Sequence, residues 1–317
     1  MQYRVGTAWR AAIVTSILMV SIVIASACAR REPQGTEHVS FNTPEEAVAA
    51  LVDSLEKSNL LELRRLLGPD SEALLSSGDA VADGNERESF LRRYGVQHTL
   101  VAGGPDELVL EAGSDNWPLP IPLVRDGGRW HFDGAAGSEE LVLRRIGANE
   151  LRTIDVMRGF VAAQRDYAAM PHDGIAAGTY AQKLRSDPGT QDGLYWEVKA
   201  GEPQSPAGPL LAAADAEGYS EQHKGMPYHG YVYRMLFAQG PAADGGSRHY
   251  IVDGRLKSGF GLIARPAVYG VSGVMTFMVN QDGVIWQRDL GEDTARLAGA
   301  IREVNPDDRW TPIPPES

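Results

Sequence analysis

The sequence predicts an α+β protein, because its helical and strand-like patterns occupy separate stretches of the chain. Apolar residues recur at helical spacing over residues 43–57 and again over 149–169. Alternating apolar and polar residues, punctuated by Gly, Pro, Asn and Asp, fill residues 97–133 and 228–290. Short connections separate these strand-like segments, which favours antiparallel pairing. We therefore expect helices and antiparallel sheets in two successive groups.

Length and charge limit the classes of function. The 317 residues suffice for two domains of roughly 100–200 residues each. The net charge is −12, and without residues 1–27 there remain 28 basic and 42 acidic residues, a net charge of −14. Such an acidic excess repels phosphate backbones, so we expect no nucleic-acid partner. The sequence contains no complete catalytic, metal-binding or cofactor-binding motif, so we expect no cofactor.

The amino terminus is typical of an exported protein. Arg4 and Arg10 precede an apolar run over residues 11–24, and Ala25-Ser26-Ala27 lies directly before Cys28, the only cysteine. This arrangement resembles the lipobox of bacterial lipoproteins, which implies lipidation of Cys28 and a membrane anchor. The alternative is an ordinary signal peptide cleaved before the same residue. Ala29 follows, and by resemblance this implies the outer membrane, with the protein on its periplasmic side.

We divide the chain into a signal peptide (1–27), a flexible, polar tether (28–40), two domains (41–147 and 148–305) and a Pro-rich tail (306–317), which should be loose from Thr311. The first domain should begin with helices at residues 43–57, 60–67 and 86–94. Strands should follow at 97–102, 107–112, 119–124 and 129–133. Helices followed by a curled antiparallel sheet resemble the cystatin-like cone of nuclear-transport-factor-2-like (NTF2-like) domains. His131 and Asp133 could face into such a cone, but a strand histidine between Trp130 and Phe132 favours a structural role.

The second domain should open with a helix over Glu150–Ala169, capped by Asn149. Its apolar stripe includes Ile154, Met157 and Phe160, and the solvent side includes Arg152. Shorter helices are predicted at 180–186, 210–217 and 294–304. A long helix followed by an antiparallel meander resembles the headpiece of pilins and pseudopilins, although a pilin helix begins in the membrane and here a whole domain precedes it.

The meander should contain strands at 228–239, 248–252, 259–264, 273–279 and 283–288, with a hairpin turn at Asn280–Gly283. A calcium loop at this turn is disfavoured because too few oxygen ligands are present. Two histidines, His229 and His249, could hold a metal with Asp253 or Asp282, but no close ligand spacing supports this. The candidate binding face is an aromatic sheet face made of His229, Tyr231, Tyr233, Tyr250 and Trp286.

Five segments carry a further resemblance that spans nearly all the mature chain. They are Leu74–Asp79, Trp117–Val124, Gly193–Trp196, Pro227–Tyr231 and Tyr269–Phe277. The sequences of these segments resemble those of the bacterial DUF2950 family of uncharacterised proteins. The resemblance implies a Gram-negative envelope protein and supplies no activity and no site residues.

Three functions stay open at this point. The favoured one is a non-enzymatic envelope lipoprotein that binds or organises a ligand or an envelope protein partner. It would use the aromatic face and the Pro/Gly-rich loop over residues 193–210, since Tyr and Trp provide large contact area. The second is an envelope hydrolase with a carboxylate pair. The third is an accessory component of a pilus or of a secretion machine of the type II kind.

Overall fold

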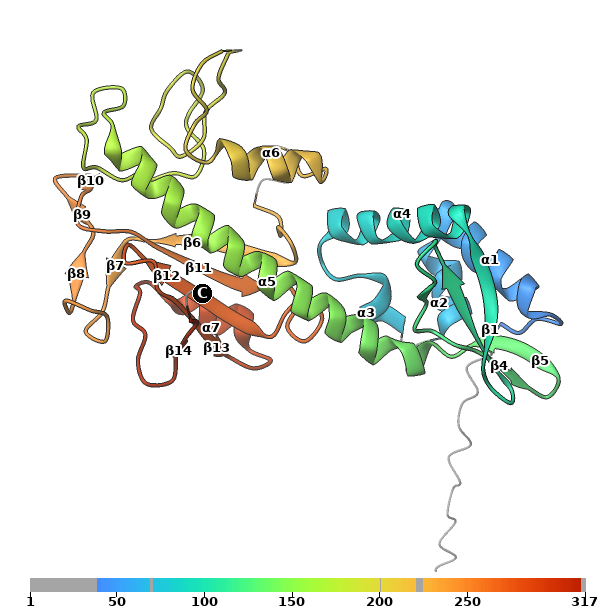
Figure 1. Ribbon diagram of the computed structural model, residues 1–317. Coiled ribbons are helices and arrows are strands. Elements are labelled where there is room, and N and C mark those ends of the chain that lie inside the picture. Colours follow the sequence, from blue (N-terminus) through green and yellow to red (C-terminus); the bar gives the residue numbers. More distant parts are fainter. Residues whose placement is uncertain (1–38, 69–70, 200, 221–224, 315–317) are drawn as a thin grey trace, which may run out of the picture. The chain divides into compact units, whose positions relative to one another are not determined.

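The structure, a computed structural model, describes residues 39–68, 71–199, 201–220 and 225–314 (Figure 1). It confirms the α+β class, with helices, antiparallel sheets, a long helix and a second antiparallel sheet in the predicted order. The helices are α1 (Pro44–Glu56), α2 (Leu60–Leu67), α3 (Glu72–Leu75), α4 (Ala80–Val96), α5 (Gly134–Ala169), α6 (Gly208–Ala216) and α7 (Thr294–Ala300). In the described residues, no helix combines the length and apolarity needed to cross a bilayer.

Helix α1 begins where the sequence predicts it. The Thr43 side chain accepts a hydrogen bond from the backbone N–H of Glu46, and the Glu46 carboxylate accepts one from the Thr43 N–H. This reciprocal capping box satisfies two backbone donors that a helix start leaves without partners. Pro44 fits in the first turn because its missing N–H would have no partner there.

The first sheet contains five short antiparallel strands. They are β1 (His98–Gly104), β2 (Glu107–Ala112), β3 (Trp117–Pro118), β4 (Leu123–Asp126) and β5 (Arg129–Phe132). Their order is β1-β2-β4-β5, with β3 paired to β2. The first core forms between this sheet and the helices α1 and α2; its buried members include Val48, Leu51, Leu63, Leu66, Leu110, Leu123 and Phe132.

The prediction of a curled sheet is wrong, since no sheet of the described residues is curled. The pairing of β2 with β4 covers only Glu107↔Val124 and Leu108↔Leu123. The β2–β3 ladder likewise covers two residue pairs. A cone needs long, continuous ladders whose twist accumulates across the sheet. These ladders are too short for that.

Helix α5 is longer than predicted. It starts at Gly134, where Asp133 accepts a hydrogen bond from the N–H of Ala136 at 3.0 Å. The predicted start at Glu150 with an Asn149 cap is therefore wrong: Asn149 lies inside the helix, and its side-chain amide donates to the carbonyl oxygen of Ser272 at 3.0 Å. The predicted domain boundary at 147/148 falls within α5, and the division into domains stays a prediction.

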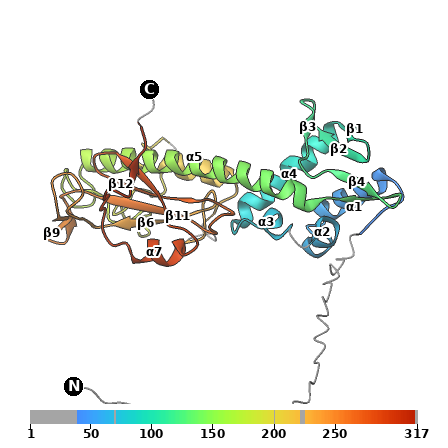
Figure 2. The ribbon, with the colours of Figure 1, turned by 90° about the horizontal axis from the view of Figure 1, so that it is seen from below.

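The second sheet lies between two helices. Its antiparallel strands follow the order β14-β13-β12-β11-β6. Their bounds are β6 (Tyr231–Leu236), β11 (Gly261–Pro266), β12 (Met275–Asn280), β13 (Ile285–Asp289) and β14 (Thr311–Pro312). Figure 2 shows α5 and α7 on opposite sides of the sheet. Two small hairpins complete the strands, β7 (Ala238–Gln239) with β8 (Arg248–His249) and β9 (Ile251–Val252) with β10 (Arg255–Leu256).

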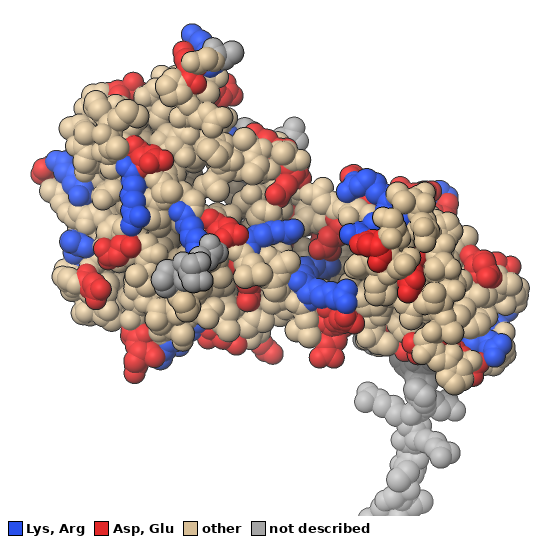
Figure 3. All heavy atoms as spheres, viewed as in Figure 1, with Lys and Arg blue, Asp and Glu red and all other residues tan. Residues whose placement is uncertain are grey.

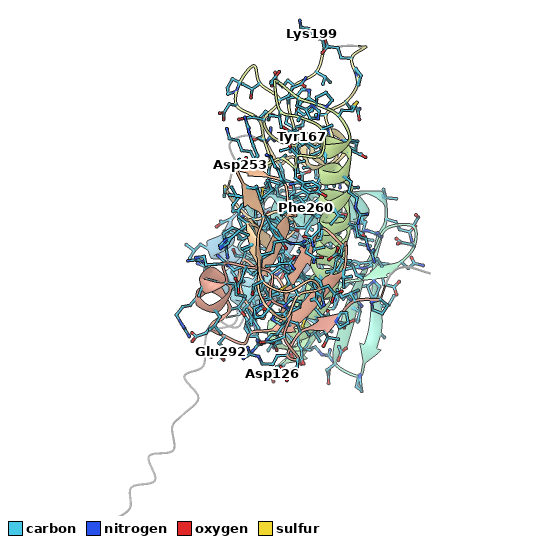
Figure 4. The ribbon with its side chains drawn as sticks, turned by 90° about the vertical axis from the view of Figure 1, so that its left-hand side faces the viewer. Asp126, Tyr167, Lys199, Asp253, Phe260 and Glu292 are labelled. Carbon is cyan, nitrogen blue, oxygen red and sulfur yellow. The ribbon has the colours of Figure 1, made fainter. Side chains whose placement is uncertain are left out.

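The two faces of the second sheet contribute to separate cores. On the α5 side, Met157, Phe160 and Tyr167 of the helix pack in one cluster with Tyr231, Phe260 and Phe277. Figure 4 labels Tyr167 on α5 and Phe260 just before β11 in this region, whereas Lys199 and Asp253 lie on exposed loops. On the α7 side, Leu236, Ile263 and Met278 pack with Ala298 and Trp310. Because both faces are covered, the sheet is an internal layer.

Of three local predictions, one is confirmed and two are wrong. The hairpin turn at Asn280–Gly283 is confirmed, with Gly283 at a φ of 82° between β12 and β13. The helix predicted over 180–186 is wrong, since Tyr180 and Arg185 instead form isolated bridges to Leu256 and Tyr195. The prediction of a loose tail is also wrong at residues 311–312, which pair with β13. Each difference reflects a partner distant in sequence.

Two glycines of α5 provide a matched test of this packing. A Cβ on Gly134 would lie 1.9 Å from the Leu67 carbonyl oxygen, whereas one on Gly147 would meet no atom within 4 Å. Gly134→Ala should lower the free energy of unfolding by about 2 kcal/mol or more through overpacking. Gly147→Ala should raise it by about 0.5–1 kcal/mol, because Ala is the better helix former. Urea unfolding of both variants tests this, and equal effects of the same sign would contradict the α5 start described here.

Candidate functional site

An open pocket of about 710 Å³ lies against the first core. Its wall is mostly apolar and comes from the helices α1 to α5 and from the segment around β3. Six half-buried side chains give it this character: Leu55, Leu74, Leu75, Phe90, Trp117 and Leu141. A contiguous apolar surface left open to solvent on a folded chain marks an interaction or ligand site.

Charged side chains around the pocket are unbalanced in sign. Six arginines line it, against three acidic residues. The arginines are Arg87, Arg92, Arg93, Arg144, Arg145 and Arg152, and the acids are Asp83, Glu86 and Glu217. The whole chain has a net charge of −12, whereas arginines outnumber acidic residues among the side chains that line the pocket. On the face shown in Figure 3 both signs are interspersed among uncharged residues, with Lys and Arg side chains prominent near the middle.

The arginines differ in what holds them. Four have carboxylate partners: Arg92 pairs with Glu88, Arg93 with Asp115, Arg144 with Glu140 and Arg145 with Glu86. Arg87 on α4 and Arg152 on α5 make no hydrogen bond or ion pair with any residue of the described segments. Each of these two guanidinium groups therefore keeps five N–H donors for water or a ligand.

Arg145 has a structural position in the pocket wall. Only 7% of its side chain is exposed. Its guanidinium donates to the carbonyl oxygens of Ala73 at 2.6 Å and Leu74 at 2.9 Å, and it contacts Glu86 at 3.3 Å. Its Nε has no hydrogen-bond partner among the described residues. Arg145 thus fixes the short helix α3, and with it Leu74, against α5.

A polar cluster forms part of the pocket lining. Glu217, Tyr219 and His229 line the wall there. His229 is 6% exposed and has a φ of 50°, a left-handed conformation that is uncommon for a residue other than glycine. Its Nε2 lies 3.4 Å from a carboxylate oxygen of Glu217, and its ring lies 4.0 Å from that of Tyr228. The strained backbone directs a buried imidazole into this cluster.

Asp79 connects the cluster to α4. It is 2% exposed, and its carboxylate caps α4 by accepting from the N–H of Ala82 at 3.1 Å. The same carboxylate accepts from the Tyr219 hydroxyl at 2.8 Å and from the Gly230 N–H at 2.9 Å. A buried carboxylate is tolerated when several donors satisfy it. Asp79 therefore joins the start of α4 to the segment that leads into β6.

Burial shifts the acid–base behaviour of the cluster. Burial, reinforced by the positive charge of Arg152, lowers the pKa of His229 to about 4. Burial also raises the pKa of Glu217, and it raises the pKa of Tyr228 to about 12. His229 is therefore neutral at pH 7 and a weak base, which makes it poorly suited to general-base catalysis near neutral pH.

The structure separates the residues of the predicted aromatic face. His229 alone lines the pocket. Tyr231, Tyr233 and Tyr250 belong to or pack against the core on the α5 side, and Trp286 packs on the α7 side with Leu290 and Ile301. The three tyrosine hydroxyls bond internally, Tyr231 to the Met275 carbonyl at 2.9 Å, Tyr233 to Thr153 at 3.2 Å and Tyr250 to Gln239 at 3.0 Å.

No group of three or more His, Cys, Asp or Glu side chains that could hold a metal occurs within residues 39–68, 71–199, 201–220 and 225–314. Cys28, the predicted lipidation site, lies outside the described residues. Sequence reasoning missed the pocket and its arginines. A signal was present, because Arg144, Ala148 and Arg152 follow one another at intervals of four along a helix.

Fold and site together define an α+β protein with an apolar, arginine-rimmed pocket next to its first core. The chain belongs to the family described as "Protein of unknown function (DUF2950)", which matches residues 38–313. No curated protein and no solved structure matches the chain.

The His229 environment predicts a pH dependence of stability. Unfolding returns the imidazole to its ordinary pKa of 6.5, so the unfolded chain binds the proton more tightly than the folded chain. The contribution of His229 to stability is full above pH 6.5 and falls as the pH drops toward 4, by up to about 3 kcal/mol.

His229→Asn is the matched variant, because Asn tolerates a positive φ and does not titrate. Urea unfolding of both proteins from pH 8 to pH 4 should show the wild-type advantage shrinking across this interval. Glu217, whose pKa is raised, shifts stability in the opposite sense in both proteins, so their difference isolates His229. A constant difference would contradict the lowered pKa.

Proposed function

We propose that this chain is a lipoprotein on the periplasmic side of the bacterial envelope that binds a ligand with an apolar chain, and that it is not an enzyme. The observation that carries the proposal is the apolar pocket of about 710 Å³. Ligand sites commonly have volumes of about 300–1,000 Å³ and mostly apolar walls with a few polar groups. The pocket has both properties.

Burial energy makes such binding plausible in magnitude. Each methylene group removed from water contributes about 0.8 kcal/mol. A chain that buries about ten methylene groups therefore gains about 8 kcal/mol, before the association cost of at least about 4 kcal/mol is subtracted. The half-buried side chains Leu74, Phe90 and Leu141 supply the complementary apolar surface.

The chemistry around the pocket favours binding over catalysis. No serine, threonine or cysteine side chain hydrogen bonds to His229 in the part of the chain that the structure describes, so no nucleophile is activated by it. Its pKa of about 4 leaves it a weak base at pH 7. These observations argue against a nucleophile activated by His229, and an envelope hydrolase with a carboxylate pair is an alternative proposal.

A partner role has one observation in its favour. Leu143 and Leu151 on α5 are exposed at 59% and 67%. These side chains offer apolar contact to an envelope protein partner. A long helix on an antiparallel sheet is also the arrangement that resembles pilin headpieces, so an accessory role in a pilus or secretion machine is the alternative proposal.

The anchor is the first test. Cys28→Ser should abolish incorporation of radiolabelled palmitate and move the protein from the membrane fraction to the soluble fraction, because acyl chains supply the membrane affinity. Ser26→Ala, which keeps a small residue before the cleavage site, should change neither result. Persistent labelling of the Cys28→Ser protein would refute lipidation at this cysteine.

Ligand binding is the second test. In calorimetric titrations of the Cys28→Ser chain with straight-chain alcohols, the Kd should fall about fourfold for each added methylene until the pocket is full, since 0.8 kcal/mol is more than half of a tenfold change. Leu141→Trp fills the pocket and should weaken binding at least tenfold. Leu143→Trp, two residues along α5 but exposed, should leave the Kd unchanged. Equal effects of the two tryptophans would place the ligand elsewhere.

A further inference from the structure

We infer that the ligand is an anionic amphiphile, whose acidic head binds at Arg87 and Arg152 while its apolar chain enters the pocket. The inference rests on the proposed function, because it specifies the ligand of the same pocket. The shared chemistry of the head is a carboxylate or a phosphate monoester. Both groups accept the paired N–H donors of a guanidinium.

The first argument is the placement of unused charge. Arg87 lies on α4 and Arg152 on α5, so the two groups come from different helices that both line the pocket. Neither forms an ion pair or hydrogen bond within the described segments, in contrast to Arg92, Arg93 and Arg144. A ligand head that accepts from both would be held against two walls at once.

The second argument concerns the neighbouring acid, Glu217. Its carboxylate lines the pocket and contacts the Nε2 of His229, and it makes no ion pair with Arg152. Burial is the main cause of the lowered pKa of His229 and of the raised pKa of Glu217, and the positive charge of Arg152 adds to the first shift and opposes the second. Arg152 therefore shares the pocket lining with Glu217 and His229, and no carboxylate of the described residues forms an ion pair with it.

The third argument excludes other head groups. Arg87 and Arg152 line the pocket without an ion-pair partner among the described residues, whereas Arg92, Arg93, Arg144 and Arg145 are paired, so a cationic head at Arg87 and Arg152 is repelled. A neutral head such as an alcohol would remove water from Arg87 and Arg152 without replacing those hydrogen bonds by charged acceptors. An acidic head is attracted by the two guanidinium groups, and its oxygens accept the hydrogen bonds that water would otherwise accept.

The test compares probes that share one chain. Dodecanoate, dodecyl phosphate, dodecanol and dodecyltrimethylammonium are titrated calorimetrically into the full-length Cys28→Ser chain at pH 7.5, below their micellar concentrations. In the chain that keeps Arg87 and Arg152, the Kd of one or both acids should be at least tenfold lower than the Kd of dodecanol. This difference should become smaller as salt is added. The stronger of the two acids identifies the head group. The ammonium probe should bind more weakly than the alcohol.

Variants assign the preference to the two arginines. Arg87→Gln and Arg152→Gln should each reduce the acid-to-alcohol ratio, and the double variant should bring it below threefold while the affinity for dodecanol stays within twofold. Arg296→Gln removes the same charge from α7, where Arg296 pairs with Asp293, and should leave the ratio unchanged. Thermal melting of each variant shows that it is folded.

The outcomes separate the two proposals. If the acids and dodecanol bind equally well to the wild-type pocket, the inference of an anionic head is overturned and the apolar-chain proposal stands. If the double variant keeps the full preference, the head lies elsewhere and the assignment to Arg87 and Arg152 is overturned. If no probe binds, the proposed function itself fails, and the inference fails with it.

Discussion

The continuity of α5 is the constraint on which the structure depends. At 1.5 Å per residue, its 36 residues extend over roughly 54 Å. Leu141 packs against the first core, and Met157, Phe160 and Tyr167 belong to the core on one face of the second sheet. The pocket takes part of its wall from the same helix. A break in α5 would therefore disturb two cores and the pocket together.

Polar side chains of α5 hold it to the segment that leads into β12. Near its middle, the Asn149 amide donates to the Ser272 carbonyl, and a Glu150 oxygen accepts from the N–H groups of Val274 and Met275, both at 2.9 Å. These contacts hold the start of β12 to the helix. They also explain why a cap residue can occupy the helix interior, because its side chain is used in a tertiary hydrogen bond.

The sequence could predict those elements whose signals are local. The helices predicted over residues 43–57 and 60–67 and the turn at Gly283 all depend on neighbouring residues, and each is found close to its predicted place. The start of α5 could not be predicted in this way. Gly147 followed by Asn149 is locally a plausible helix boundary, but the packing of Leu141 against the first core and the burial of Ile146 outweigh the propensity cost of about 1 kcal/mol.

The site was harder to predict than the fold for a related reason. Alternation of Tyr231 and Tyr233 indicates a shared strand face, but it cannot show that α5 covers that face. The pocket requires side chains from several helices to converge, and no single segment carries that information. Only His229 of the predicted aromatic residues lines it. The positive φ of His229 could not be predicted from the sequence either, since nothing in residues 227–231 requires it at a histidine.

Two arginines on α5 show how the structure distinguishes stability from function. Arg145 is buried and is engaged by two backbone carbonyls and a carboxylate, so its charge is used within the protein. Arg152 is exposed and has no such partners in the described chain, although it lies two turns further along the same helix. Folding gains little from a cation that bonds only to water. The position of Arg152 in the lining of an apolar pocket is thus better explained by a ligand than by the stability of the fold.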